Sequence, residues 1–160
     1  MYWKRYYLWV YCIVSLIIVT LDRLSKWLVV KYFSPGESVT VVPRVFLLTY
    51  VTNPGGAFGI LARHRDQFVL LGVVLLVVIV AASFYLGKSS LALNLALAFL
   101  TGGILGNLVD RLHTGYVIDF LDFRVWPVFN LADTFICVGT ALLAFMLLFP
   151  RGGRKGDESS

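Results

Sequence analysis

Four of the nine acidic residues of this chain lie in three short polar segments that are separated and flanked by apolar sequence. These segments contain Asp110, then Asp119 and Asp122, and then Asp133. Carboxylates at membrane depth cost free energy, so a hydrophobic chain that keeps several of them together is expected to use them. The pattern favours chemistry performed by paired carboxylates at a membrane surface.

Two of these acids lack a positive charge nearby in the sequence. Asp119 and Asp133 have no lysine or arginine within four residues on either side. Asp122, in contrast, is two residues from Arg124, and side chains at that spacing share a face of an extended segment and can pair. Elimination leaves Asp119 and Asp133 as the candidate catalytic pair; the alternative is two separate, hydrogen-bonded surface acids.

Other acids have partners close in sequence. Asp22 and Lys26 are four apart on a predicted helix, where their side chains meet. They form either a neutralised pair only, or a pair in which Asp22 also orients a neighbouring polar group. Asp110 precedes Arg111, which is either a structural partner at a helix end or, with five donors and a permanent charge, a binder of carbonyl-rich or anionic ligands.

The apolar segments before Asp119 and after Asp133 are joined by a short connection, so they are expected to be adjacent antiparallel helices. The two carboxylates then face each other at the edge of the bilayer. Two close carboxylates cannot easily both be charged, so they share a proton and titrate as a unit. Such a pair can take a proton from a water that attacks a peptide carbonyl and return one to the leaving amine, without a covalent intermediate.

Other chemistries have little support in the sequence. The two histidines form no H-E-x-x-H motif or Cys/His cluster, so neither a metal site nor a cofactor is expected. No G-x-S-x-G elbow is present, and the adjacent Ser25 and Lys26 point about 100° apart on a helix, so they cannot form a dyad with each other. Cys12 and Cys137 lie in apolar runs and are expected to be buried free thiols. The net charge of +5 comes from scattered residues, which argues against nucleic-acid binding.

The composition indicates a membrane protein, since 59% of the 160 residues are hydrophobic and only 14% are charged. Four stretches are long enough to span a bilayer. We predict an all-α membrane protein, a four-helix bundle with one domain over 1–150, and a disordered cytoplasmic tail over 151–160. The predicted helices lie near 6–30, 68–86, 91–109 and 129–149.

The connection between the first two helices is rich in Val, Thr, Tyr and Phe over Ser38–Val42 and Val45–Thr52, with Pro43 and Arg44 between them. This pattern predicts a small extracytoplasmic β-cradle over about 36–62, resting on the membrane surface. Basic residues cluster beside helix ends near both termini, so both termini are expected in the cytoplasm and the active site at the extracytoplasmic face.

The polar segments together resemble those of the bacterial lipoprotein signal peptidases, or signal peptidase II, over roughly residues 6 to 149. Five motifs occur in the order of that family: D-x-x-x-K, an N-x-G-A-A-F-like turn, G-G-x-x-G-N-x-x-D-R, V-x-D-F and F-N-x-A-D. In this chain they begin at Asp22, Asn53, Gly102, Val117 and Phe129. Gly56 departs from the pattern, because the family usually has alanine there.

The resemblance implies a multi-pass aspartic endopeptidase of the bacterial cytoplasmic (inner) membrane. Its substrates would be prolipoproteins whose lipobox cysteine already carries diacylglycerol, cut just before that cysteine. Asp119 and Asp133 would be the catalytic dyad, and membrane lipids would be partners. The resemblance also implies roles for other polar residues: substrate binding or ordering of the site by Asn53, Asn107, Arg111 and Asn130, and support by Asp22, Lys26 and Asp110.

Two other classes of function are compatible with parts of the sequence. A small transporter could use Asp22, Asp110 and Asp133 as a proton relay, but a relay should spread its acids through the membrane depth. A non-catalytic assembly factor would tolerate asparagine at both dyad positions. With one catalytic set in each chain, we expect a monomer.

Overall fold

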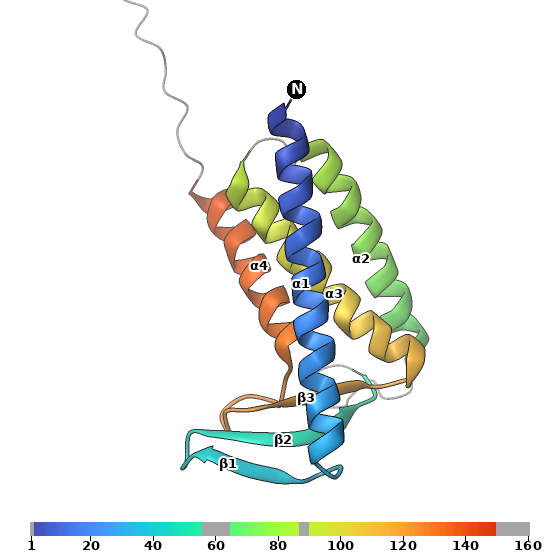
Figure 1. Cartoon of the computed structure of the whole chain (residues 1–160), viewed down its shortest axis with the longest axis vertical. Helices are drawn as coiled ribbons and strands as arrows, with labels where there is room; N and C mark the ends of the chain where they lie inside the picture. Colours follow the sequence, from blue (N-terminus) through green and yellow to red (C-terminus); the bar gives the residue numbers. More distant parts are fainter. Residues whose placement is uncertain (1, 56–64, 87–89, 150–160) are drawn as a thin grey trace, which may run out of the picture.

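The computed structural model describes residues 2–55, 65–86 and 90–149. They form helices and strands in the order α1, β1, β2, α2, α3, β3, α4 (Figure 1). The helices are α1 (Tyr2–Tyr32), α2 (Arg65–Leu86), α3 (Leu91–His113) and α4 (Leu131–Leu148), and the strands are β1 (Ser38–Val42), β2 (Phe46–Asn53) and β3 (Val117–Asp122). The predicted all-α membrane fold with a small sheet is confirmed. The predicted tail 151–160 and the departure at Gly56 lie outside the described residues.

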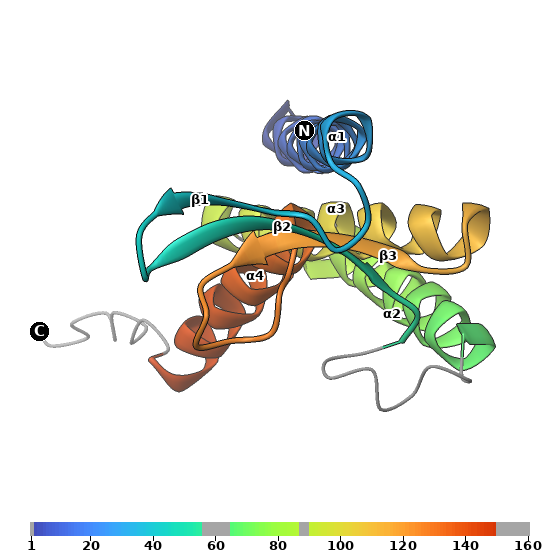
Figure 2. The same cartoon turned by 90° about the horizontal axis from the view of Figure 1, so that it is seen from below.

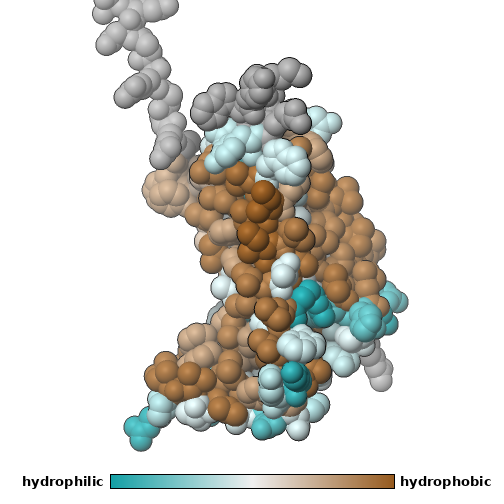
Figure 3. Space-filling view, viewed as in Figure 1, coloured by the Kyte–Doolittle hydropathy of each residue, from teal (hydrophilic) through white to brown (hydrophobic). Residues whose placement is uncertain are grey.

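All four helices are long and apolar enough to cross a membrane. Their outer surfaces carry large exposed hydrophobic side chains, and hydrophobic residues cover most of the helical part of the face in Figure 3. Cys12 and Cys137 are free, as predicted, but they are exposed and not buried. The prediction was wrong because an apolar run in a membrane helix also includes positions that face lipid.

Helix α3 is the centre of the bundle, packing against α1 on one side and against α2 and α4 on the other (Figure 2). Two glycines of α3 make this packing possible. A Cβ on Gly103 would lie 2.5 Å from the carbonyl oxygen of Ala132, and a Cβ on Gly106 would lie 2.5 Å from Oδ2 of Asp22. Small residues allow membrane helices to approach closely, so these positions bring both α1 and the start of α4 against α3.

Helix α3 continues to His113, one turn past the predicted end at residue 109. Its start is capped by Ser90, whose side chain accepts a hydrogen bond from the backbone N–H of Leu93. At its end, the guanidinium of Arg65 donates to the carbonyl oxygens of Arg111 and Leu112. These bonds satisfy carbonyls that a helix end leaves free and tie α2 to α3.

The strands form one antiparallel sheet in the order β1, β2, β3, which lies across one end of the helix bundle (Figures 1 and 2). β1 has the predicted bounds, and β2 is displaced by one residue from the prediction. The third strand comes from the connection between α3 and α4, with Val51 of β2 opposite Asp119 of β3. Val29, Tyr50, Ile118 and Phe120 form the core between α1 and this sheet.

Candidate active site

Asp119 and Asp133 come from different elements and line the same cavity. Asp119 is in β3 and is 2% exposed, while Asp133 lies in the first turn of α4. The cavity has a volume of about 240 Å³ and is also lined by residues of α3, α4 and the β3–α4 connection, among them Trp126 and Ile136. The predicted convergence of the two carboxylates is therefore present, at the end of the bundle that carries the sheet.

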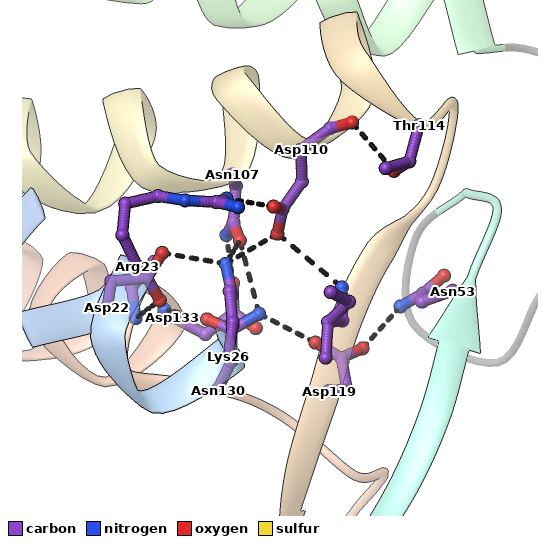
Figure 4. A network of polar contacts seen from close by, with 12 residues as sticks. Asp22, Arg23, Lys26, Asn53, Asn107, Asp110, Thr114, Asp119, Asn130 and Asp133 are labelled. Carbon is purple, nitrogen blue, oxygen red and sulfur yellow. Dashed lines mark hydrogen bonds and ion pairs between the residues drawn. The ribbon is translucent and has the colours of Figure 1, made fainter. Parts of the chain in front are cut away.

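Two asparagine amides connect the carboxylates (Figure 4). Asn130 caps α4, accepting a bond of 2.9 Å from the backbone N–H of Asp133. Its Nδ2 donates to Asp119 Oδ1 at 2.6 Å and to Asn107 Oδ1 at 3.1 Å. Asn107 in turn donates from Nδ2 to Asp133 Oδ1 at 2.7 Å. Each carboxylate is thus fixed by an amide that is itself held in place.

Asn53 holds the second oxygen of Asp119. It donates from Nδ2 to Asp119 Oδ2 at 2.9 Å, and its Oδ1 accepts a bond of 3.1 Å from the N–H of Gly55. The acceptor bond fixes the orientation of the amide, so that its NH₂ group points at the carboxylate. The turn after β2 is therefore part of the site.

The environment of Asp119 favours its protonated form. Burial, and secondly the negative charge of Asp133, raise the pKa of Asp119 from its ordinary 3.8 to about 7, although hydrogen bonds from Asn53 and Asn130 act in the opposite direction. Among the described residues no cation forms an ion pair with Asp119 or Asp133. A carboxyl group with such a pKa can hold or release a proton near neutral pH.

A second polar cluster lies beside the pair, and its Asp22, Lys26 and Asp110 side chains are fully buried. Lys26 Nζ lies 2.8 Å from Asp22 Oδ2 and 2.7 Å from Asp110 Oδ2, and it donates to Asn107 Oδ1 at 3.0 Å. Asp110 also forms an ion pair with Arg23. The predicted pairing of Asp22 with Lys26 is present.

Arg23 is a residue that sequence reasoning missed, since the predicted local partner of Asp110 was Arg111. The cations that pair with Asp110 come from α1, more than eighty residues earlier in the chain, and no local pattern could have found them. The predicted side-chain pair of Asp122 with Arg124 is also absent. Asp122 instead accepts from the backbone N–H of Arg124 at 2.8 Å and from the hydroxyl of Thr49 at 3.1 Å.

The buried cluster orders the site through backbone contacts as well. Asp22 Oδ1 accepts a bond of 3.0 Å from the N–H of Ala132, next to Asp133. Asp110 Oδ2 accepts a long bond of 3.5 Å from the N–H of Ile118, next to Asp119. The cluster therefore fixes the two backbone segments that carry the candidate pair.

Arg111 faces the site without taking part in the buried ion pairs. Its guanidinium lies over the ring of Phe68, with 5.2 Å between the guanidinium carbon and the ring centroid. Its Nε is buried and has no hydrogen-bond partner among the described residues. It lines both the site cavity and a second cavity of about 170 Å³ between α2, α3 and α4. An arginine placed this way brings a permanent positive charge to both cavities.

Among the described residues, no group of three or more His, Cys, Asp or Glu side chains could hold a metal ion. The chemistry that the described site itself offers is proton transfer by two carboxyl groups, with amide and guanidinium donors around them. Such a set suits hydrolysis of a bond whose carbonyl group can be polarised and attacked by water.

The sequence and the fold are both similar to known proteins. The family model described as signal peptidase (SPase) II matches residues 14–149. A lipoprotein signal peptidase of Moorella thermoacetica is 47% identical over 148 residues, covering 92% of this chain and 98% of the relative. One of Bacillus subtilis is 35% identical over 152 residues, covering 92% and 99%. A solved bacterial membrane enzyme has a TM-score of 0.86 at 28% identity, covering 94% of each chain.

Proposed function

The chain belongs to the signal peptidase II family and is a multi-pass bacterial membrane peptidase. We propose that it removes signal peptides from prolipoproteins whose lipobox cysteine carries diacylglycerol. Cleavage falls just before that cysteine. Related chains that cover nearly all of this one are named lipoprotein signal peptidases, which supports the substrate class.

We propose that Asp119 and Asp133 are the catalytic pair. The observation that carries this assignment is the opening of both carboxylates, without an ion-pair partner among the described residues, into one cavity of about 240 Å³. Asp119 is the better candidate to carry the shared proton at rest, because burial and the charge of Asp133 raise its pKa to about 7.

In the proposed reaction Asp133 takes a proton from a water as its oxygen attacks the scissile carbonyl, while Asp119 gives its proton to the carbonyl oxygen. The tetrahedral intermediate then collapses. The carbon–nitrogen bond breaks, the new amine receives the proton held by Asp133, and the proton on the former carbonyl oxygen returns to Asp119. The pair ends in its starting state, and no covalent intermediate is needed.

The remaining polar residues divide into two proposed roles. The side-chain oxygen of Asn130 accepts one hydrogen bond and its NH₂ group donates two, all within the protein. Its proposed role is therefore to position Asp119 and Asp133. Asn53 and Asn107 hold one carboxylate each and line the cavity. Arg111 also lines the cavity and brings a permanent positive charge to the substrate. Asp22, Lys26 and Asp110 support the site from behind.

The arrangement supports a site at the extracytoplasmic face. The start of α1 and the end of α4 lie at the end of the bundle opposite the sheet (Figure 1), so both termini would be cytoplasmic. The second cavity opens between apolar side chains of α2, including Leu71 and Leu75, beside Arg111. A signal peptide, which has an apolar core, could approach laterally through this region while its lipid chains stay in the bilayer.

A proton relay is less well supported by the geometry. Asp22 and Asp110 are held in buried ion pairs with Lys26, which removes them as free proton carriers. The acids near the site also lie close together, beside the end of α3, β3 and the start of α4 (Figure 4).

The test is cleavage by the purified full chain in lipid, with two synthetic precursors that differ only in the diacylglyceryl group on the cysteine. We expect mass spectrometry to detect cleavage before the cysteine of the modified precursor only, and EDTA to leave the rate unchanged. Equal cleavage of both precursors would refute the lipid requirement. A folded protein that cleaves neither would refute the peptidase function.

A further inference from the structure

One end of the sheet carries exposed apolar and basic side chains that the proposed reaction does not use. We define the tip patch as Val42, Arg44, Val45, Arg124, Val125 and Trp126. The β1–β2 turn and the connection after β3 meet there, because Leu47 of β2 is opposite Asp122 of β3 and the rings of Phe46 and Phe123 have centroids 4.8 Å apart. Figure 3 shows hydrophobic residues gathered at this end, beyond the waist between the sheet and the helices.

The apolar members of the patch are strongly exposed. Val125 is 90% exposed and Trp126 is 68% exposed, and Val42 and Val45 are also exposed. A patch of this kind on a soluble face would favour association or aggregation. On a protein held in a bilayer, the adjacent membrane surface can cover it.

The register of the sheet indicates which way this surface faces. Leu48 and Tyr50 pack in the core between the sheet and α1, and Val39 is the antiparallel partner of Leu48. Directly opposed residues project from the same face of a sheet, so Val39 lies on the helix-facing side. The bulge between Thr40 and Val42 sets two residues of β1 opposite Phe46, which belongs to the same face as Leu48. The face that packs against α1 thus continues along β1 and β2 to the tip of the sheet.

The two arginines give the patch its charge. Arg44 and Arg124 are the positive-φ residues other than glycine in the described chain, with φ of 65° and 67°. Both are exposed, and within the described part of the chain neither guanidinium forms an ion pair. Glycine adopts this backbone conformation at lower cost than arginine, so folding alone does not favour arginine at either turn.

We propose that the tip patch binds anionic phospholipid headgroups of the bilayer in which the helices sit. Valine side chains and an indole at headgroup depth, beside two arginines, are the combination that interfacial membrane-binding surfaces use. The patch is continuous with the site, because Trp126 also lines the cavity of Asp119 and Asp133. Its occupant is therefore the membrane surface at the mouth of the cavity.

The first experiment measures the depth of Trp126 in the full chain with Trp3, Trp9 and Trp27 replaced by phenylalanine. The protein is reconstituted in vesicles of phosphatidylcholine and phosphatidylglycerol. We expect nitroxides attached near the lipid headgroup to quench Trp126 more strongly than acrylamide in the water phase. Stronger quenching by acrylamide would overturn the proposal. Trp126 fluorescence that is not quenched by the lipid nitroxides but changes with the protein-to-lipid ratio would show that a second copy of the chain covers the patch. That result would also overturn the proposal.

The second experiment tests the charge with the same single-tryptophan protein. Energy transfer from Trp126 to dansyl-labelled phosphatidylglycerol is compared with transfer to dansyl-labelled phosphatidylcholine. Each basic residue near an anionic surface contributes about a fivefold preference for anionic over zwitterionic lipid, so two arginines should give roughly a thirtyfold preference for phosphatidylglycerol. We expect R44G/R124G to abolish this preference and R44K/R124K largely to keep it.

Folding does not confound this test. The glycine variant relieves the positive-φ backbone, so its thermal unfolding temperature should equal or exceed that of the parent. The matched control is Lys31→Gln, which removes an exposed cation that lies over the ring of Trp27 near the same end of the bundle. We expect it to keep the preference. An unchanged preference in R44G/R124G would overturn the proposal. Neither measurement depends on peptidase activity, so a failure of lipid binding can be distinguished from a failure of the proposed reaction.

Discussion

The two neighbouring acidic clusters of this protein differ in what neutralises them. Asp22 and Asp110 are paired with Lys26, and Asp110 also with Arg23. Asp119 and Asp133 accept hydrogen bonds from amides, with no ion-pair partner among the described residues. The two clusters lie side by side (Figure 4), and Asp22, Asp110 and Asp119 are all buried, so burial alone does not set their roles. Losing the cation of a buried ion pair leaves an uncompensated charge, whereas a buried acid whose hydrogen bonds come from neutral groups has no ion-pair partner that fixes its charge.

The clusters meet at a single side chain, Asn107. Its Oδ1 accepts from Lys26 and from Asn130, and its Nδ2 therefore has to face Asp133. The charged cluster thus orients the amide that holds the candidate base, without itself reaching the cavity. Substitutions in the two clusters should separate into effects on activity and effects on stability.

The largest effect is expected from Asp119→Asn and Asp133→Asn. Each variant removes a group that transfers protons in the proposed reaction, so we expect cleavage of the diacylglyceryl precursor to fall roughly 10³-fold or more. The helix content measured by circular dichroism should stay unchanged.

The matched control for these variants is Asp122→Asn. It changes an acid of the same strand whose partners are Thr49 and the N–H of Arg124. We expect its activity to be within a few-fold of the parent, because Asp122 does not line the cavity. Equal losses in all three variants would show that the strand, and not the pair, was damaged.

The next effect is on stability, in Lys26→Met. Removing one partner of a buried ion pair leaves uncompensated charge, which costs about 3–5 kcal/mol. We expect the free energy of unfolding to fall by that amount, measured by denaturation in detergent. The double variant D22N/K26M leaves Asp110 with Arg23 and no other unpaired acid in this cluster, so it should be more stable than K26M. A double variant no more stable than K26M would contradict the role given to charge compensation.

A smaller effect is the pH dependence of stability that Asp119 contributes. Its folded pKa of about 7 lies above its ordinary 3.8, so the folded state binds more protons between these values. Stability from this group is therefore greatest at low pH and is lost as the pH rises. Between pH 6 and pH 8 the loss should be roughly 1.4 kcal/mol.

Asp119→Asn should remove this slope, which thermal unfolding across the pH range can measure. The cleavage rate of the parent should decline over the same range, as Asp119 loses the proton that it donates. A parent protein whose stability rises between pH 6 and pH 8 by the same amount would contradict the assigned pKa.

The sequence was sufficient for the features that depend on local spacing. The four-residue spacing of Asp22 and Lys26 predicted their pair, and the apolar lengths predicted the helices. Asp119 and Asp133 could be singled out because cations were absent near them in the sequence. In the structure, too, neither acid forms an ion pair with a cation among the described residues. Lys26 is held by Asp22 and Asp110, and Arg111 lines the cavity without forming an ion pair.

Features that depend on long-range packing could not be predicted from the sequence. Arg23 reaches Asp110 only because the small residues of α3 let α1 lie against it. β3 was expected to be extended, but its place beside β2 depends on where the fold puts the end of α3. The bond from Asn53 to Asp119 follows from that pairing and joins residues 66 positions apart. Resemblance to the family suggested Asn53, whereas spacing alone did not.

The smallest effect is expected from Arg23→Gln, which tests whether the charged cluster depends on both of its cations. Arg23 has a side chain that is 37% exposed, while Asp22, Lys26 and Asp110 are fully buried. Asp110 keeps Lys26 when Arg23 is lost, and partly exposed pairs contribute little, so the free energy of unfolding should fall by only about 1 kcal/mol. The cleavage rate should change less than threefold, because Lys26 still orients Asn107. If the free energy of unfolding fell as much as in Lys26→Met, Asp110 would depend on both cations equally. Arg23 would then belong to the structural cluster together with Lys26.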